Sequence, residues 1–169
     1  MVRSWMFATI SGYNMPPFTE MDLTAQDTAL SVASEGLDSA HPRNFILIVD
    51  DDPGILMLVS KMVRHLGFRP KTAVDGRDAL ETMEKYTCWL VITDDEMPAM
   101  DGYQLAEEIQ GRHLGTQVII MSALQEGERL NALVASGLVA GTLLKPFNLK
   151  ALRKTVKEAN SRRPERWVC

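Results

Sequence analysis

The sequence predicts an α/β fold, a doubly wound parallel sheet of five strands with five helices. From residue 45 onwards, short apolar runs alternate five times with segments whose apolar residues recur at helical spacing. Two of the apolar runs, 45–49 and 88–93, are almost continuous, as expected of parallel strands that are buried on both faces. This alternation implies right-handed crossovers and helices on both faces of the sheet.

The first half of the pattern contains two strands and two helices. The run 45–49 (FILIV) is the first strand, and Pro53 stands where the first turn of a helix tolerates proline. Gly67 ends that helix, whose spaced apolar residues are Ile55, Leu58, Val59, Met62, Val63 and Leu66. Segment 69–74 (RPKTAV) is a short, edge-like strand, and 75–86 is a helix with three inward residues, Ala79, Leu80 and Met83.

The second half contains three strands and three helices in alternation. Their predicted ranges are strand 88–93, helix 102–112 through Leu105 and Ile109, strand 117–123, helix 126–137, strand 141–144, and helix 148–160 with Leu149, Leu152 and Val156 inward. In an open sheet of this kind, ligands collect outside the carboxyl ends of the strands, where the strand order reverses. The residues at the strand ends are therefore the candidates for a site.

Four of the five strands end in polar groups that should meet at one edge: Asp50, Asp51 and Asp52, then Asp94, Ser122 and Lys145. A single Asp at such a place is most often a turn residue or a helix cap, but that interpretation explains the joint occurrence poorly. Carboxylates that face a lysine suit a hard cation such as Mg²⁺. A lysine and a hydroxyl can hold phosphoryl oxygens, and one carboxylate can act as a nucleophile that forms an acyl phosphate.

Four short segments, in this order and at this spacing, resemble the receiver domain of bacterial two-component response regulators: ILIVDDDP, VITDDEMPAMDG, IIMSA and LLKPF. The resemblance covers residues 44–160 and implies the flavodoxin-like strand order 2-1-3-4-5 of the chemotaxis receiver. Residues 1–43 lack sustained periodicity and are expected to form a flexible extension. Residues 161–169 are expected to be a short tail, too short for a DNA-binding or enzymatic output domain.

The resemblance implies how the site would handle a phosphoryl group. Asp94 is the first residue past its strand and lies three before Met97, so it matches the phosphoacceptor. Ser122 matches the hydroxyl that follows the phosphoryl group, and Lys145 matches its cationic partner. The pair Lys145-Pro146 resembles a cis peptide of the family, a bond form largely confined to X-Pro.

The resemblance also implies a site for Mg²⁺, with Mn²⁺ as a second candidate. Asp51 matches a direct ligand, Asp50 a mainly water-mediated one, and Asp94 is shared between the metal and the phosphoryl group. Glu96 matches the position whose backbone carbonyl, rather than its side chain, binds the metal. Two neighbouring acids receive no role in this comparison, Asp52 outside the acidic pair and Asp95 at a variable loop position.

One position departs from the family that the sequence resembles. Three residues before Lys145 the family usually carries Tyr or Phe, whose ring turns inward on activation, and this chain has Thr142. Threonine is small and stiff at χ1, so it cannot fill the volume of an aromatic ring. We therefore expect weaker coupling between the phosphoryl site and the surface of the domain.

The implied function is that of a single-domain response regulator in a two-component phosphorelay. A sensor histidine kinase or a histidine phosphotransfer protein would phosphorylate Asp94, and the altered face around the fourth helix, fifth strand and fifth helix would bind a downstream protein. Receivers catalyse their own phosphorylation and dephosphorylation. The chain is therefore expected to be a switch and not a metabolic enzyme.

Two other functions stay open at this point. A degenerate receiver would bind its partner independently of phosphorylation, although all the chemical residues are present here. A phosphatase of the haloacid-dehalogenase type would use Asp50-x-Asp52 as its nucleophile motif. Those enzymes need a further acidic motif beyond the lysine, whereas Pro, Phe, Asn and Leu follow Lys145, and no cap insertion is present.

Composition and charge limit the classes of protein and the cellular compartments that fit this sequence. The 169 residues are 46% hydrophobic and 24% charged, which is enough apolar content for a core. The net charge of -4 gives no general reason to expect nucleic-acid binding. No apolar run approaches the roughly 18 residues of a membrane span, and no signal peptide is expected. Two cysteines do not make a disulfide framework, which favours a reducing cytoplasm.

Overall fold

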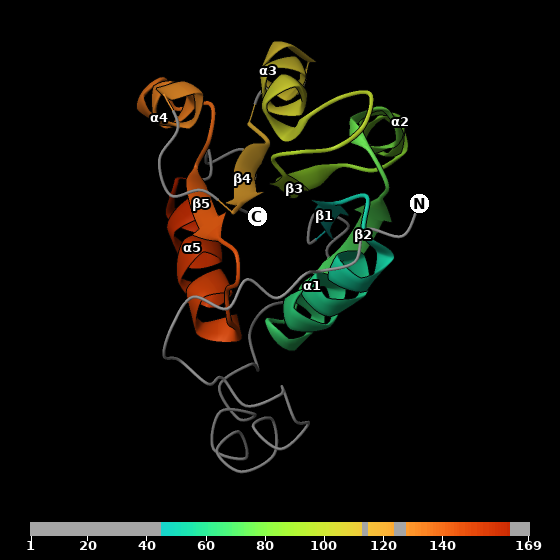
Figure 1. Cartoon of the computed structure of the whole chain (residues 1–169). Helices are drawn as coiled ribbons and strands as arrows, with labels where there is room; N and C mark the ends of the chain where they lie inside the picture. The colour runs from blue at the N-terminus through green and yellow to red at the C-terminus, as the bar shows by residue number, and fades with distance from the viewer. Residues whose placement is uncertain (1–44, 113–114, 124–127, 163–169) are drawn as a thin grey trace, which may run out of the picture. The chain divides into compact units, whose positions relative to one another are not determined.

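The structure is a computed structural model that describes residues 45–112, 115–123 and 128–162. Ten elements alternate along them: β1 (Phe45–Val49), α1 (Pro53–His65), β2 (Arg69–Ala73), α2 (Gly76–Lys85), β3 (Cys88–Asp94), α3 (Gly102–Arg112), β4 (Gln117–Ser122), α4 (Glu128–Ala135), β5 (Gly141–Leu144) and α5 (Leu149–Ser161) (Figure 1). The expected extension over residues 1–43 and most of the expected tail lie outside the described residues, and so does the predicted start of α4 at residue 126.

The strand order is the one that the sequence predicts. All five strands pair in parallel, in the order β2-β1-β3-β4-β5. The prediction that β2 is an edge strand is confirmed, and β5 forms the other edge. Because the order reverses between β1 and β3, their carboxyl ends border the crevice where open sheets of this type bind ligands.

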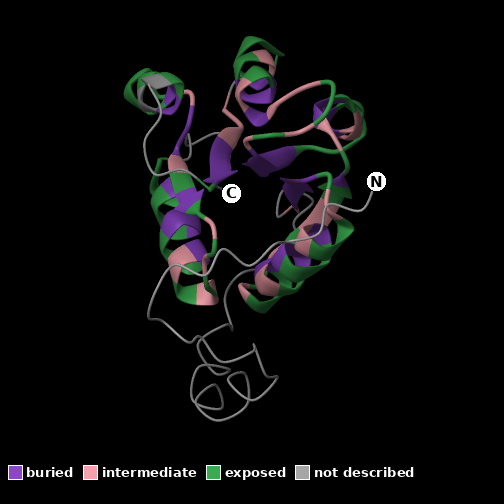
Figure 2. Cartoon of the chain, in the orientation of Figure 1, coloured by how far each residue is buried: buried purple, intermediate pink, exposed green. Residues whose placement is uncertain are grey.

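The helices form two layers, with α1 and α5 on one face of the sheet and α2, α3 and α4 on the other (Figure 1). Alternate residues of β1 supply the two cores, since successive side chains of a strand point to opposite faces. Ile46 and Ile48 pack with α1 and α5, whereas Leu47 and Val49 pack with the other three helices. Every residue of β3 is buried, as its unbroken apolar run predicts (Figure 2).

The buried stripe of α1 differs in part from the predicted one. Leu58, which the spacing pattern included, is 40% exposed, whereas Leu56, which it left out, is buried. The buried residues of this helix are Leu56, Val59, Ser60 and Val63, and the last three follow Leu56 by three, four and seven positions. These positions form one face of a helix, and the predicted residues Ile55, Met62 and Leu66 are partly buried against the same core, so Leu58 is the one predicted residue that faces solvent.

Candidate functional site

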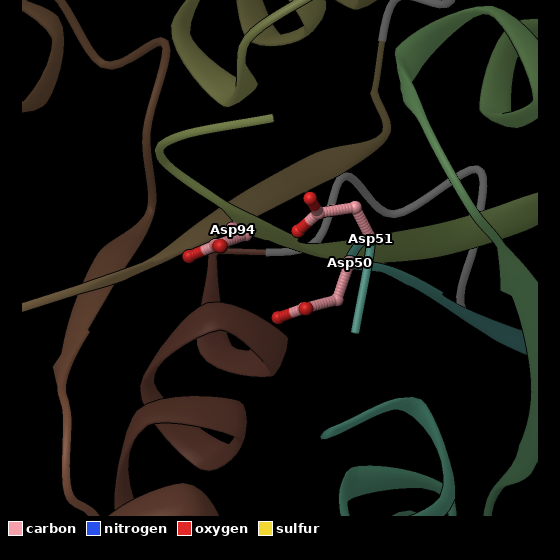
Figure 3. A group of neighbouring side chains, drawn as sticks. All are labelled: Asp50, Asp51 and Asp94. Carbon is pink, nitrogen blue, oxygen red and sulfur yellow. The ribbon is translucent and has the colours of Figure 1, made fainter. Parts of the chain in front are cut away.

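Three carboxylates gather at the carboxyl ends of β1 and β3. One oxygen from each of Asp50, Asp51 and Asp94 lies within 4.8 Å of the others (Figure 3). Asp50 is buried, Asp94 is 9% exposed and Asp51 is exposed, so the group lies at the mouth of the crevice. Oxygen donors at this spacing suit a hard divalent cation, which would also offset the repulsion among the carboxylates.

Lys145 joins two of these carboxylates from the far edge of the sheet. Its Nζ donates to Asp94 Oδ1 at 2.7 Å and to Asp50 Oδ2 at 3.3 Å. The Lys145 backbone N–H donates to the carbonyl of Ser122 at 2.8 Å, which fixes the end of β5 against β4. The Lys145-Pro146 peptide is cis, as the resemblance implied. The ammonium group therefore stands between the ends of β1, β3 and β5.

Burial and charge shift the pKa values of these groups. The pKa of Asp94 is raised to about 6, mainly by burial; Lys145 opposes this shift, and the charges of Asp50 and Asp95 add to it. Burial likewise raises the pKa of Asp50. Burial alone would lower the pKa of Lys145. Its hydrogen bonds to Asp94 and Asp50, together with the negative charges of these two carboxylates, outweigh burial and raise the pKa. The carboxylates of Asp50 and Asp94 are thus poorly solvated, and a bound cation would stabilise their charged forms.

Gly102 lets the loop after β3 return close to Asp94. A Cβ atom at Gly102 would collide with the backbone carbonyl oxygen of Asp94. The Gly102 N–H donates to the backbone carbonyl of Asp95 at 3.2 Å, which closes the loop where α3 begins. A close approach of two backbone segments needs a residue without a side chain.

Asp95, to which the sequence comparison gave no role, contacts the site directly. The Ser122 hydroxyl donates to Asp95 Oδ2 at 2.6 Å, and the Asp95 N–H donates to Asp94 Oδ1 at 3.0 Å. Burial raises the pKa of the Tyr103 phenol, and the charge of Asp95, with a hydrogen bond to it, raises that pKa further. The carboxylate of Asp95 therefore lies between the end of β4 and the start of α3.

The other predicted positions lie around this group. Asp52 caps α1, because its Oδ1 accepts from the Gly54 N–H at 2.6 Å. Glu96 is exposed in the loop after β3, and the role of its backbone carbonyl as a metal ligand stays a prediction. Thr142 is exposed on β5, where it pairs with Ile120 of β4.

The raised pKa of Asp94 predicts a pH dependence of the metal-free protein. A group whose pKa is raised on folding stabilises the fold below its unfolded pKa, 3.8, and this contribution is lost as the pH rises through about 6. Between pH 5 and pH 7 the linkage amounts to about 1 kcal/mol of unfolding free energy. In urea titrations with a chelator, Asp94→Asn should lose less stability than the wild type over this range. Equal losses in the two proteins would contradict the expectation.

The strand order and the acidic group together define a flavodoxin-like α/β domain whose crevice is compatible with Mg²⁺. The family model of the response regulator receiver domain matches residues 46–157. The chain therefore belongs to the response regulator receiver family, whose members serve in two-component systems.

Relatives and solved structures agree with this assignment. The chain is 32% identical over 158 residues to the sensor histidine kinase RcsC of Salmonella typhi, a match that covers 90% of this chain and 16% of that protein. The chain thus spans about a sixth of the length of this curated relative.

Solved structures share the fold of this chain, and two of them serve as examples. The chemotaxis protein CheY4 of Vibrio cholerae has a TM-score of 0.63 and 30% identity, with 69% of this chain and 98% of that one covered. The response regulator TrrA of Thermotoga maritima, solved in complex with Mg²⁺-BeF, has a TM-score of 0.61 and 29% identity, with coverage of 69% and 98%. Across the described residues, no helix is both long enough and apolar enough to span a membrane.

Proposed function

We propose that this chain is a phosphoacceptor switch in which Asp94 takes a phosphoryl group from a sensor histidine kinase or a histidine phosphotransfer protein. The observation that carries the proposal is the 2.7 Å bond from Lys145 Nζ to Asp94 Oδ1, made beside two further carboxylates. One oxygen of Asp94 attacks the phosphorus, the phosphorus–nitrogen bond of the donor breaks, and the imidazole leaves. Lys145 is placed to stabilise charge on the transferred oxygens.

In this proposal Mg²⁺ binds beside the phosphorylated residue. Asp51 and Asp94 would be direct carboxylate ligands, Asp50 would act mainly through water, and the backbone carbonyl of Glu96 would be a further ligand from the protein. The donor set supports the assignment, since Mg²⁺ and Mn²⁺ both prefer carboxylate and carbonyl oxygens. When bound, the cation would neutralise negative charge on the phosphoryl oxygens.

The switch is read by a separate downstream protein. In our proposal the receiver spans residues 44–160, Ser122 follows the phosphoryl group, and α4, β5 and α5 present the altered surface. The net charge of -4 supports a protein partner rather than direct contact with nucleic acid. The free, buried Cys88 thiol supports a reducing cytoplasm as the place of action.

A phosphatase function has less support than the switch. Asp52, the second acid of the motif that such an enzyme would need, instead accepts the Gly54 N–H as the cap of α1. Its carboxylate also lies outside the group formed by Asp50, Asp51 and Asp94. A phosphorylation-independent module is the remaining alternative, and it predicts equal partner binding by the wild type and Asp94→Asn.

Intact mass measurement tests the proposed function in one experiment. Incubation with acetyl phosphate and Mg²⁺ should add the mass of one phosphoryl group, and mild alkali should remove it because acyl phosphates hydrolyse readily. Chelation of the metal should prevent the addition. An unmodified mass under conditions where Mg²⁺ binds would contradict the proposal.

Thr142 predicts a small response at the surface of the domain. In the family an aromatic ring at this position fills space that opens when the hydroxyl residue moves, and a threonine side chain cannot fill that space. A ligand shifts an equilibrium only by its differential interaction with the two states. We therefore expect Thr142→Tyr to enlarge the change in hydrogen exchange over residues 128–147 that beryllofluoride and Mg²⁺ cause.

The matched control for this substitution is Thr72→Tyr on β2, which adds the same ring to the opposite edge strand. It should leave the response over residues 128–147 unchanged. If Thr142→Tyr gives a response no larger than that of the wild type, the missing ring is irrelevant and the coupling follows another route.

A further inference from the structure

The Ser122 hydroxyl is already engaged when Asp94 carries no phosphoryl group. It donates to Asp95 Oδ2 at 2.6 Å, within the roughly 2.5–2.7 Å range of charge-assisted O–H···O⁻ bonds. Ser122 is only 2% exposed, so water has little access to replace this acceptor. A serine hydroxyl carries one hydrogen, which it can donate to only one strong acceptor at a time.

Asp95 is held in this position from two sides. Its backbone N–H donates both to Asp94 Oδ1 and to the carbonyl of Met121, each at 3.0 Å. On the other side is the Tyr103 phenol, whose pKa is raised first by burial, then by the charge of Asp95, with a smaller contribution from a hydrogen bond to the Asp95 carboxylate. The carboxylate is thereby fixed beside the phosphoacceptor and within reach of the hydroxyl at the end of β4.

Tyr103 is itself restrained by α4. The Arg129 guanidinium lies over the Tyr103 ring, with 4.9 Å between its central carbon and the ring centroid. Arg129 also pairs with Asp101 at 3.1 Å and with Glu107 at 3.6 Å. These contacts connect the start of α3 to α4 and limit the freedom of the ring that borders Asp95.

We infer that Asp95 is a positioning residue that holds the Ser122 hydroxyl away from the phosphoryl group and so weakens the switched state. The inference rests on the proposed function, in which Ser122 follows the phosphoryl group. To do so, the hydroxyl must exchange the carboxylate of Asp95 for a phosphoryl oxygen. The wild type therefore gains only the difference between two charge-assisted bonds, and removal of Asp95 removes the competing acceptor.

Beryllofluoride with Mg²⁺ serves as the probe, because it mimics a phosphoryl group on a carboxylate. Removal of a competing hydrogen bond to a charged acceptor should change the affinity about tenfold, which corresponds to about 1.4 kcal/mol. Asp95→Ala should therefore bind beryllofluoride about tenfold more tightly than the wild type in calorimetric titrations. Glu108→Gln, which removes an exposed charge that pairs with Arg112 on α3, should bind as the wild type does.

Asp95→Asn separates the hydrogen bond from the charge. The amide removes the negative charge but keeps an oxygen that accepts from Ser122, so its gain in affinity should be smaller than that of Asp95→Ala. In a Ser122→Ala background the two Asp95 variants should bind equally well, because no hydroxyl remains to be released. If Asp95→Ala does not fold, Asp95→Cys replaces it, since a thiol is a weak acceptor.

Two results would overturn the inference. One is an affinity of Asp95→Ala that does not exceed that of Asp95→Asn in the protein with Ser122. The other is that, in the Ser122→Ala background, Asp95→Ala binds beryllofluoride more tightly than Asp95→Asn by the same factor, which would mean that the effect does not depend on the hydroxyl. A wild type that binds Mg²⁺ but no beryllofluoride would instead contradict the proposed function, so the two failures are distinguishable.

Discussion

Asp94→Asn should abolish labelling by a small phosphodonor, because it replaces the proposed nucleophile by an amide of almost the same shape. The amide keeps an oxygen that can accept from Lys145, which in the wild type contacts Asp94 at 2.7 Å. The fold should therefore survive while the chemistry is lost. Intact mass after incubation with acetyl phosphate and Mg²⁺ measures the effect.

Asp52→Asn is the matched control for Asp94→Asn. It makes the same chemical change at the end of the neighbouring strand, and asparagine caps helices as well as aspartate does, so α1 should keep its cap. This variant should be labelled to the same extent as the wild type. Labelling that persists in Asp94→Asn, or that is lost in Asp52→Asn, would show that the nucleophile has been misplaced.

The second large effect is expected at the cation site. Mg²⁺ that binds only the folded state stabilises it by mass action, by about 2.7 kcal/mol at a concentration one hundred times the dissociation constant. Asp51 supplies one of three carboxylate oxygens that lie within 4.8 Å of one another. If Asp51→Asn weakens binding a hundredfold, the same concentration of Mg²⁺ should add only about 0.4 kcal/mol.

The comparison must use the difference between melts with and without Mg²⁺. Three neighbouring carboxylates repel one another, so Asp51→Asn can stabilise the metal-free protein while it weakens metal binding. Asp52→Asn again serves as the control and should keep the full Mg²⁺-induced increase in melting temperature. If Asp51→Asn and Asp52→Asn lose the Mg²⁺-induced increase in melting temperature to the same extent, the acidic pair lies one position further along the chain.

The fold could be predicted almost completely because its signals are local. The apolar run of β3 and the spaced apolar residues of α5 predict their elements without knowledge of any neighbour. The predicted ends of the helices and strands differ from the observed ends by one or two residues. Capping residues determine these ends, such as Asp75 before α2 and Asn148 before α5.

The candidate site could be predicted only in part. Asp50, Asp51 and Lys145 follow strands, and a parallel topology brings such residues to one edge whatever the loops do. The contact between Asp95 and Ser122 is different, since the two residues are 27 positions apart and meet through the side-chain conformation of a loop residue. No pattern in the sequence carries that information.

The most direct test of the proposed function locates the phosphoryl group in the wild-type protein. After incubation with acetyl phosphate and Mg²⁺, borohydride reduces an aspartyl phosphate to homoserine, and peptide mass spectrometry identifies the altered position. The proposed function predicts a single homoserine, at Asp94. Homoserine at Asp50, Asp51, Asp52 or Asp95, or a protein without any homoserine, would contradict it.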